Sequence, residues 1–84
     1  ENPGSFRVYP NPAKNSVYIQ PENYHSDAIT ITLLNTSGKI IHQKKYDSSD
    51  NIEFPFNVNG VDPGIYFIRV HNNTLSNTKK IVIE

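Results

Sequence analysis

The 84-residue sequence contains no cysteine and no tryptophan, and its formal net charge is zero. Without thiols the chain cannot form a disulfide framework, a thiolate nucleophile or a zinc–thiolate site. Eight lysine and arginine residues balance eight aspartate and glutamate residues, so the chain lacks the basic footprint of a nucleic-acid-binding protein. We therefore expect no nucleic-acid partner.

Long apolar runs and helix-forming residues are also scarce. No segment approaches the roughly 18 apolar residues of a membrane-spanning helix, so we expect no transmembrane segment. Alanine and leucine together number five, whereas isoleucine, valine and threonine together number 21. Because β-branched side chains fit a pleated surface, this composition favours sheet over helix. The length suits one small domain with a thin core.

Short segments of alternating polarity recur along the whole chain, separated by turns rich in asparagine, glycine and proline. We expect strands within residues 6–9, 17–19, 28–35, 39–46, 52–58, 65–70 and 79–83. About seven short strands at this spacing are typical of an all-β antiparallel sandwich. Residues 1–5 are interpreted as the end of a linker, followed by a single domain over residues 6–84.

Prolines limit how these strands can pair. Pro55 cannot donate a hydrogen bond to a ladder, so we expect the fifth strand to lie at a sheet edge. Pro10 and Pro12 flank Asn11, favour extended backbone before them, and cannot join a central strand. We interpret residues 9–12 as a stiff connector that carries the chain from one sheet to the other.

Two glycines follow turn-forming residues and precede strands. Gly38 and Gly64 are therefore expected to need a positive φ at one or both positions.

The sequence offers no recognisable catalytic constellation. His25, His42 and His71 lie far apart and match no metal-ligand spacing. No phosphate-binding loop or serine nucleophile motif is present, and so short a chain leaves little room for a deep pocket beside its core. We expect no enzymatic activity, no metal and no cofactor.

Four short motifs nevertheless occur in a recognisable order. They are Tyr9-Pro10-Asn11-Pro12, Ser37-Gly38-Lys39, Gly64-Ile65-Tyr66 and Lys79-Lys80-Ile81. Together they closely resemble the type A C-terminal sorting domain of cargo proteins of the type IX secretion system (Por secretion system) in Bacteroidota. The resemblance extends from about Phe6 to the end of the sequence, and it implies an immunoglobulin-like antiparallel β-sandwich of about seven strands.

The resemblance also implies a function. Such a domain is covalently part of a larger cargo protein and acts as its secretion address. The cargo crosses the periplasm and the outer membrane, the translocon reads the address, and a sortase-like surface protease typically removes it. The cargo is then attached to the cell surface or released, so the implied localisation is secreted or cell surface.

The residues that would carry recognition follow from the position of each motif. By this resemblance they are Tyr9, Pro10, Asn11, Pro12, Gly38, Lys39, Gly64, Tyr66, Lys79 and Lys80. Two positions depart from the family pattern: the family often has aspartate where this chain has Asn35, and it commonly has a basic end where this sequence has Glu84.

An alternative of another class is an adhesive or carbohydrate-binding β-sandwich module of an extracellular enzyme. That function needs exposed aromatic side chains gathered on one face. The candidates are Tyr9, Tyr18, Tyr46 and Tyr66, and the absence of tryptophan counts against it.

Overall fold

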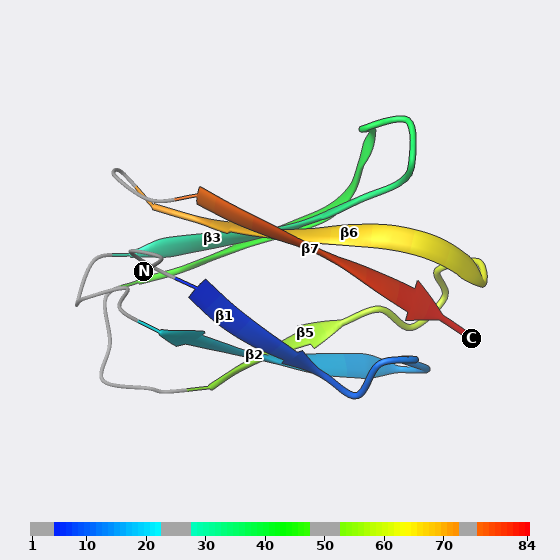
Figure 1. Cartoon of the computed structure of the whole chain (residues 1–84), viewed down its shortest axis with the longest axis horizontal. Coiled ribbons are helices and arrows are strands. Elements are labelled where there is room, and N and C mark those ends of the chain that lie inside the picture. The colour runs from blue at the N-terminus through cyan, green and yellow to red at the C-terminus, as the bar shows by residue number, and fades with distance from the viewer. Residues whose placement is uncertain (1–4, 23–27, 48–52, 73–75) are drawn as a thin grey trace.

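The computed structural model describes residues 5–22, 28–47, 53–72 and 76–84, and these residues form strands and turns without any helix. The strands are β1 (Ser5–Tyr9), β2 (Ser16–Glu22), β3 (Ile29–Leu34), β4 (Ile40–Tyr46), β5 (Phe54–Asn57), β6 (Gly64–His71) and β7 (Ser76–Ile83). They make two antiparallel sheets packed face to face (Figure 1). The predicted immunoglobulin-like antiparallel β-sandwich of about seven strands is confirmed.

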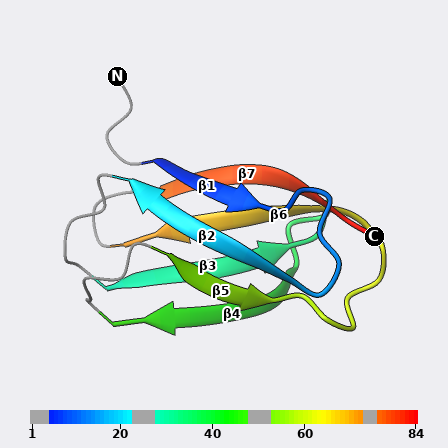
Figure 2. The ribbon, with the colours of Figure 1, turned by 90° about the horizontal axis from the view of Figure 1, so that it is seen from below.

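The two sheets differ in width. The three-stranded sheet has the order β1-β2-β5, and the four-stranded sheet has the order β4-β3-β6-β7. Seen from below, β1 lies against β7 and β5 lies against β4 (Figure 2). The edge strands of one sheet therefore face the edge strands of the other, and the core lies between the two sheets.

The core follows from alternation along each strand. In β6, Tyr66, Ile68 and Val70 are buried while the residues between them are partly exposed. The other buried apolar residues are Phe6, Ala13, Val17, Ile19, Ile29, Ile31, Leu33, Leu34, Phe54, Phe56, Val58, Ile81 and Ile83. Burying each large apolar side chain stabilises the fold by about 1.5–3 kcal/mol, which makes this inner layer the main source of stability.

Strand ends differ from the sequence-based expectations in places. β2 runs beyond residue 19, and β7 begins at Ser76, although we expected the last strand within residues 79–83. The reason is that His71 pairs with Ser76, so the β6–β7 ladder continues through polar residues whose side chains give no apolar alternation. Residues 1–4 of the expected linker, and residues 48–51 between the expected fourth and fifth strands, lie outside the described residues; Ser5 is the first residue of β1.

The prolines confirm one prediction and overturn another. β5 is an edge strand, as Pro55 predicted. The interpretation of residues 9–12 as a connector between sheets is wrong, because β1 and β2 pair with each other and Tyr9 lies opposite Tyr18. The prolines do interrupt the ladder, but they do so in a hairpin loop within one sheet. The peptide bonds before Pro10 and Pro12 are both cis.

The predicted glycine geometry is confirmed. Gly38 has a φ of 87° and Gly64 a φ of 155°, and Gly60 has a φ of 86° in the preceding turn. These values lie in a region that side chains with a Cβ rarely adopt.

We predict that Gly38→Val lowers the free energy of unfolding by about 1–3 kcal/mol. Nothing lies within 4 Å of the position that a Cβ would occupy, so the loss comes from the backbone alone. Thermal melts followed by circular dichroism measure it. Gly38→Asn is the matched control, since asparagine tolerates positive φ and should lose less. Equal melting temperatures for wild type and the valine variant would contradict the turn geometry.

Candidate functional site

Two of the four sequence motifs, Tyr9–Pro12 and Gly64–Tyr66, meet at one end of the sandwich, around the carboxyl end of β7. Gly64 pairs with Ile83 at the end of β7, and Ala13, just after the Tyr9–Pro12 motif, forms a parallel bridge to Ile83 from the other side. The 35–39 hairpin projects from the same end of the molecule but stands apart from this contact (Figure 1). Residues far apart in the sequence therefore come together around the last residues of the chain.

Hydrogen bonds hold the β1–β2 loop to β7. The Ala13 N–H donates to the Val82 carbonyl at 2.8 Å, and the Glu84 N–H donates to the Ala13 carbonyl at 2.7 Å. The Val82 N–H donates to Asn11 Oδ1 at 3.0 Å, across 71 positions of sequence. We call these contacts of Asn11 and Ala13 with residues 82–84 the loop–strand junction. It joins the edge of one sheet to the edge of the other.

The turn that contains Gly38 and Lys39 is built around Asn35. Its Oδ1 accepts hydrogen bonds from the backbone N–H groups of Ser37 and Lys39, each at 2.9 Å. The Gly38 N–H donates to the Asn35 carbonyl at 3.0 Å. An aspartate carboxylate could accept the same two bonds, so the departure from the family pattern at Asn35 preserves the turn.

Tyr66 anchors the loop that precedes its own strand. Its hydroxyl donates to the Asp62 carbonyl at 2.7 Å, while its ring lies in the core. A tyrosine that bonds back to the chain a few residues upstream is the tyrosine corner of immunoglobulin-like folds. The motif residues Gly64 and Tyr66 therefore fix the conformation of the loop that leads into β6, Gly64 by its positive φ and Tyr66 by its hydrogen bond to Asp62.

Lys79 and Lys80 lie in β7 but occupy different faces. Lys79 is opposite Ile68 on the inner side, and its Nζ lies 5.6 Å from the centre of the buried Phe6 ring. Lys80 is opposite Phe67 on the outer side. The two lysines that look equivalent in the sequence thus have different surroundings: one covers the core edge and the other faces solvent.

The tyrosines also divide by environment. Tyr9 and Tyr18 are each 40% exposed on the outer face of the three-stranded sheet, with ring centres 6.0 Å apart. Tyr46 instead packs against Phe54 at 4.7 Å between ring centres, and its hydroxyl donates to the Pro55 carbonyl. Burial raises the pKa of Tyr46 above the ordinary value of 10.0.

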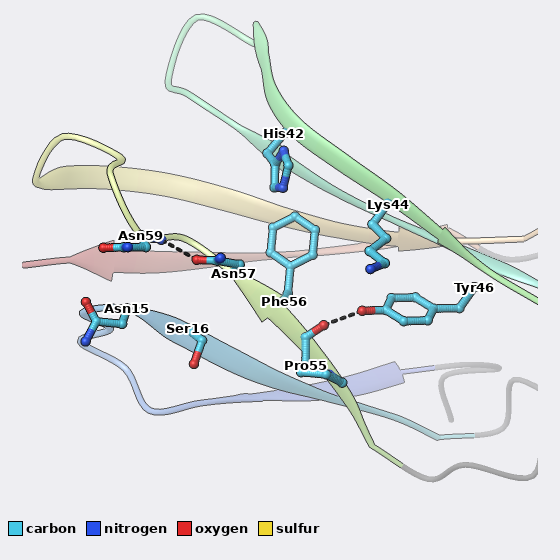
Figure 3. Close-up of a pocket in the computed structure, with 9 residues that line it drawn as sticks. All are labelled: Asn15, Ser16, His42, Lys44, Tyr46, Pro55, Phe56, Asn57 and Asn59. Atoms are coloured by element: carbon cyan, nitrogen blue, oxygen red, sulfur yellow. Dashed lines mark hydrogen bonds between the residues drawn. The ribbon is translucent and has the colours of Figure 1, made fainter.

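A groove runs between the facing edges of β4 and β5 (Figure 3). His42 lies 5.3 Å from Phe56 between ring centres, and the Lys44 Nζ lies 5.4 Å from the centre of the Tyr46 ring. The other lining residues are Asn15, Ser16, Pro55, Asn57 and Asn59. The lining residues include no carboxylate and no hydroxyl paired with a base.

The described residues contain no group of three or more histidine, cysteine, aspartate or glutamate side chains that could hold a metal ion. Nor does this part of the chain form a helix that could cross a membrane. His25 lies outside the described ranges, while His42 and His71 are in β4 and β6.

Sequence reasoning identified the motif residues but missed their partners. Ala13 and Val82 gave no signal, because a hydrogen bond between backbone groups leaves no mark on residue type. The pairing of Tyr9 with Tyr18 could have been found from the alternation of β1 and β2, had the loop between them been recognised as a hairpin.

Comparison with known families gives one result that covers nearly the whole chain. The model of the family described as "secretion system C-terminal sorting domain" matches residues 7–84. No curated protein matches the chain. The matched region begins at Arg7, the third residue of β1, and includes β2 to β7 and all four motifs.

We predict that Asn11→Ala destabilises the domain by about 0.5–1.5 kcal/mol, because the Val82 N–H loses its acceptor. Hydrogen exchange at the Val82 amide should accelerate more than exchange at core amides such as that of Ile68. Asn15→Ala is the control, since the bond that its backbone carbonyl accepts from Val58 is retained. Unaltered exchange at Val82 would contradict the junction.

The raised pKa of Tyr46 predicts a loss of stability at alkaline pH. The folded state keeps the phenol proton to higher pH than the unfolded state does. The contribution of Tyr46 to the free energy of unfolding is therefore complete below about pH 10. It is lost as the pH rises through the folded pKa. Absorbance titration of phenolate should show a late component that disappears in Tyr46→Phe. Retention of that component would assign it to another tyrosine.

Proposed function

This chain belongs to the family of secretion system C-terminal sorting domains, and we propose that residues 6–84 are the address that directs an attached cargo protein through the type IX secretion system across the outer membrane. The observation that carries this proposal is the family match over residues 7–84, which includes every motif and strands from both sheets. Membership makes the domain a C-terminal tail of a secreted or cell-surface cargo protein.

The proposal includes the steps by which the domain acts during secretion. The translocon recognises the folded domain in the periplasm, and at the surface a sortase-like protease cleaves it off or uses it for surface attachment. The domain has its own core and its own hydrogen-bonded turns, so it presents the same surface whatever cargo precedes it. This supports recognition of the folded domain before cleavage. The proposed role is recognition without catalysis.

The exposed edge of β7 supports a specific recognition element. The Val82 backbone groups bond to the β1–β2 loop, so they point away from β6. Alternate residues of a strand direct these groups to the same side, which places the N–H and C=O of Thr78 and Lys80 outward as well. Among the described residues they have no partner on that side. A partner strand can add to such an edge, with Lys80 beside it.

A second candidate, carbohydrate binding, is favoured by one observation. Tyr9 and Tyr18 form an exposed pair of neighbouring rings on the outer face of the three-stranded sheet. Sugars stack on such rings, and a polysaccharide retarding the domain in affinity electrophoresis would support this function. Loss of retardation in Tyr18→Ala would assign it to the pair.

We predict that residues 1–84 fused to a periplasmic reporter carry it out of a secreting cell, whereas the reporter alone stays in the periplasm. Lys80→Gln should leave folded fusion in the periplasm, because it removes charge beside the β7 edge without removing core area. Export is measured as reporter activity in the medium and on the cell surface, relative to activity in the periplasm.

Two variants serve as controls for this prediction. Lys79→Gln is expected to lower the melting temperature of the domain, unlike Lys80→Gln, because Lys79 covers Phe6. Lys44→Gln, on the opposite edge of the same sheet, should export normally. If the Lys80→Gln fusion folds and leaves the cell at the wild-type rate, Lys80 is not a recognition residue.

A further inference from the structure

The outer face of the four-stranded sheet carries apolar side chains where a sandwich usually presents polar ones. Leu34 in β3 pairs with Ile40 in β4 and with Phe67 in β6, so these three side chains form a row across the sheet. In the next row, Ile65 pairs with Val82. We call these five residues the outer patch.

The residues of the outer patch differ in how far they are exposed to solvent. Leu34 is 5% exposed although it faces outward, which shows that its neighbours close over it. Ile40 and Ile65, in contrast, are 52% and 49% exposed. Phe67 and Val82 are half-buried beside them. A contiguous apolar cluster with two large side chains in water is typical of a surface that another protein covers.

Charge is distributed unevenly although the chain is neutral. The strands of the four-stranded sheet contain five cations and no aspartate or glutamate: Lys44, Lys45, Arg69, Lys79 and Lys80. Arg69 and Lys80 adjoin the outer patch. Lys80 pairs with Phe67, and Arg69 lies two residues after Phe67 in β6. Neither cation has an ion-pair partner among the described residues. The nearest acids along the chain, Asp62 and Glu84, lie outside the strands.

The position of the cargo leaves this surface open. β1 begins at the end of the sandwich opposite the 35–39 hairpin and the carboxyl end of β7 (Figures 1 and 2). A C-terminal sorting domain follows its cargo in the chain, so the cargo joins at the β1 end. The outer patch lies toward the other end, where Leu34 ends β3 and Ile65 lies next to the first residue of β6.

We propose that the outer patch, with Arg69 and Lys80, is the docking surface for a protein of the secretion machinery whose contact area is apolar at its centre and lined by carboxylates. This inference rests on the proposed function and names the chemistry of the partner. The apolar residues supply the buried centre, and the two cations select an acidic rim and speed association.

A protein fits this surface better than an anionic membrane does. Lipid recognition by charge uses clusters of about four to eight cations, whereas two adjoin the outer patch. The apolar side chains also lie across a sheet, which offers a broad surface to a complementary protein, rather than along one side of an interfacial helix. A second copy of the chain would bring Arg69 and Lys80 toward like charges, which disfavours self-association.

The test uses the reporter fusion in a secreting strain. The double variant Ile40→Thr/Ile65→Thr removes exposed apolar area but keeps β-branched residues in the strands. We expect export to slow by about tenfold or more, as for loss of central contacts in an interface. The matched control, Arg7→Thr/Gln20→Thr, makes the same number of changes on the three-stranded sheet and should export at the wild-type rate.

A competition experiment reports receptor binding separately from folding of the fusion. Excess unfused domain in the periplasm should slow export of the wild-type fusion, and the isoleucine double variant should not. Arg69→Gln/Lys80→Gln, which removes no buried apolar residue, should also compete poorly. Purified variants are melted first, so that only folded domains are compared, and the charge variant decides the matter if the isoleucine variant does not fold.

The outcomes separate the two proposals. If the wild-type fusion is not exported, both the proposed function and this inference are wrong. Export of the wild type together with unchanged export and competition by folded patch variants overturns the docking surface alone. Binding of the wild-type domain to vesicles of phosphatidylcholine and phosphatidylglycerol, lost in the same variants, would identify a lipid surface and also overturn the protein partner.

Discussion

The end of β7 has a neighbouring strand on only one side, and the hydrogen bonds between residues 82–84 and the β1–β2 loop complete its other side. Ala13 and Asn11 satisfy the backbone of Val82 and Glu84, and in doing so they tie the three-stranded sheet to the four-stranded sheet. The meeting of the Tyr9–Pro12 and Gly64–Tyr66 motifs at one end of the molecule depends on this junction. Ile83, between Gly64 and Ala13, is buried because both neighbours are in place.

Strand positions could be predicted from the sequence because alternation is a local property. The strand expected within residues 65–70 alternates in any context, and in β6 its residues Tyr66, Ile68 and Val70 form the buried face. Partners could not be predicted, since pairing depends on where the chain turns back. The loop at Pro10 and Pro12 shows the limit: missing N–H groups exclude a central strand there, but they do not decide between a hairpin and a crossover.

The candidate site shows the same division between residue type and placement. Gly38 and Gly64 could be assigned to turns because few residues other than glycine accept their φ values. The different roles of Lys79 and Lys80 follow from the register of β7 on β6, which composition does not contain. Likewise a net charge of zero hides a sheet whose strands have cations and no acids. Sums over a short chain therefore say little about the surface that a partner meets.

The junction also affects when the domain can exist. The ribosome releases β7 last, and until Ile81 and Ile83 arrive the core lacks two side chains and the β1–β2 loop has nothing to bond. In a protein with this domain at its carboxyl end, the complete sandwich can form only after the entire cargo has been translated. A message cut short by a premature stop codon thus yields a cargo with no finished terminal fold. The architecture makes full-length synthesis a precondition for having an address at all.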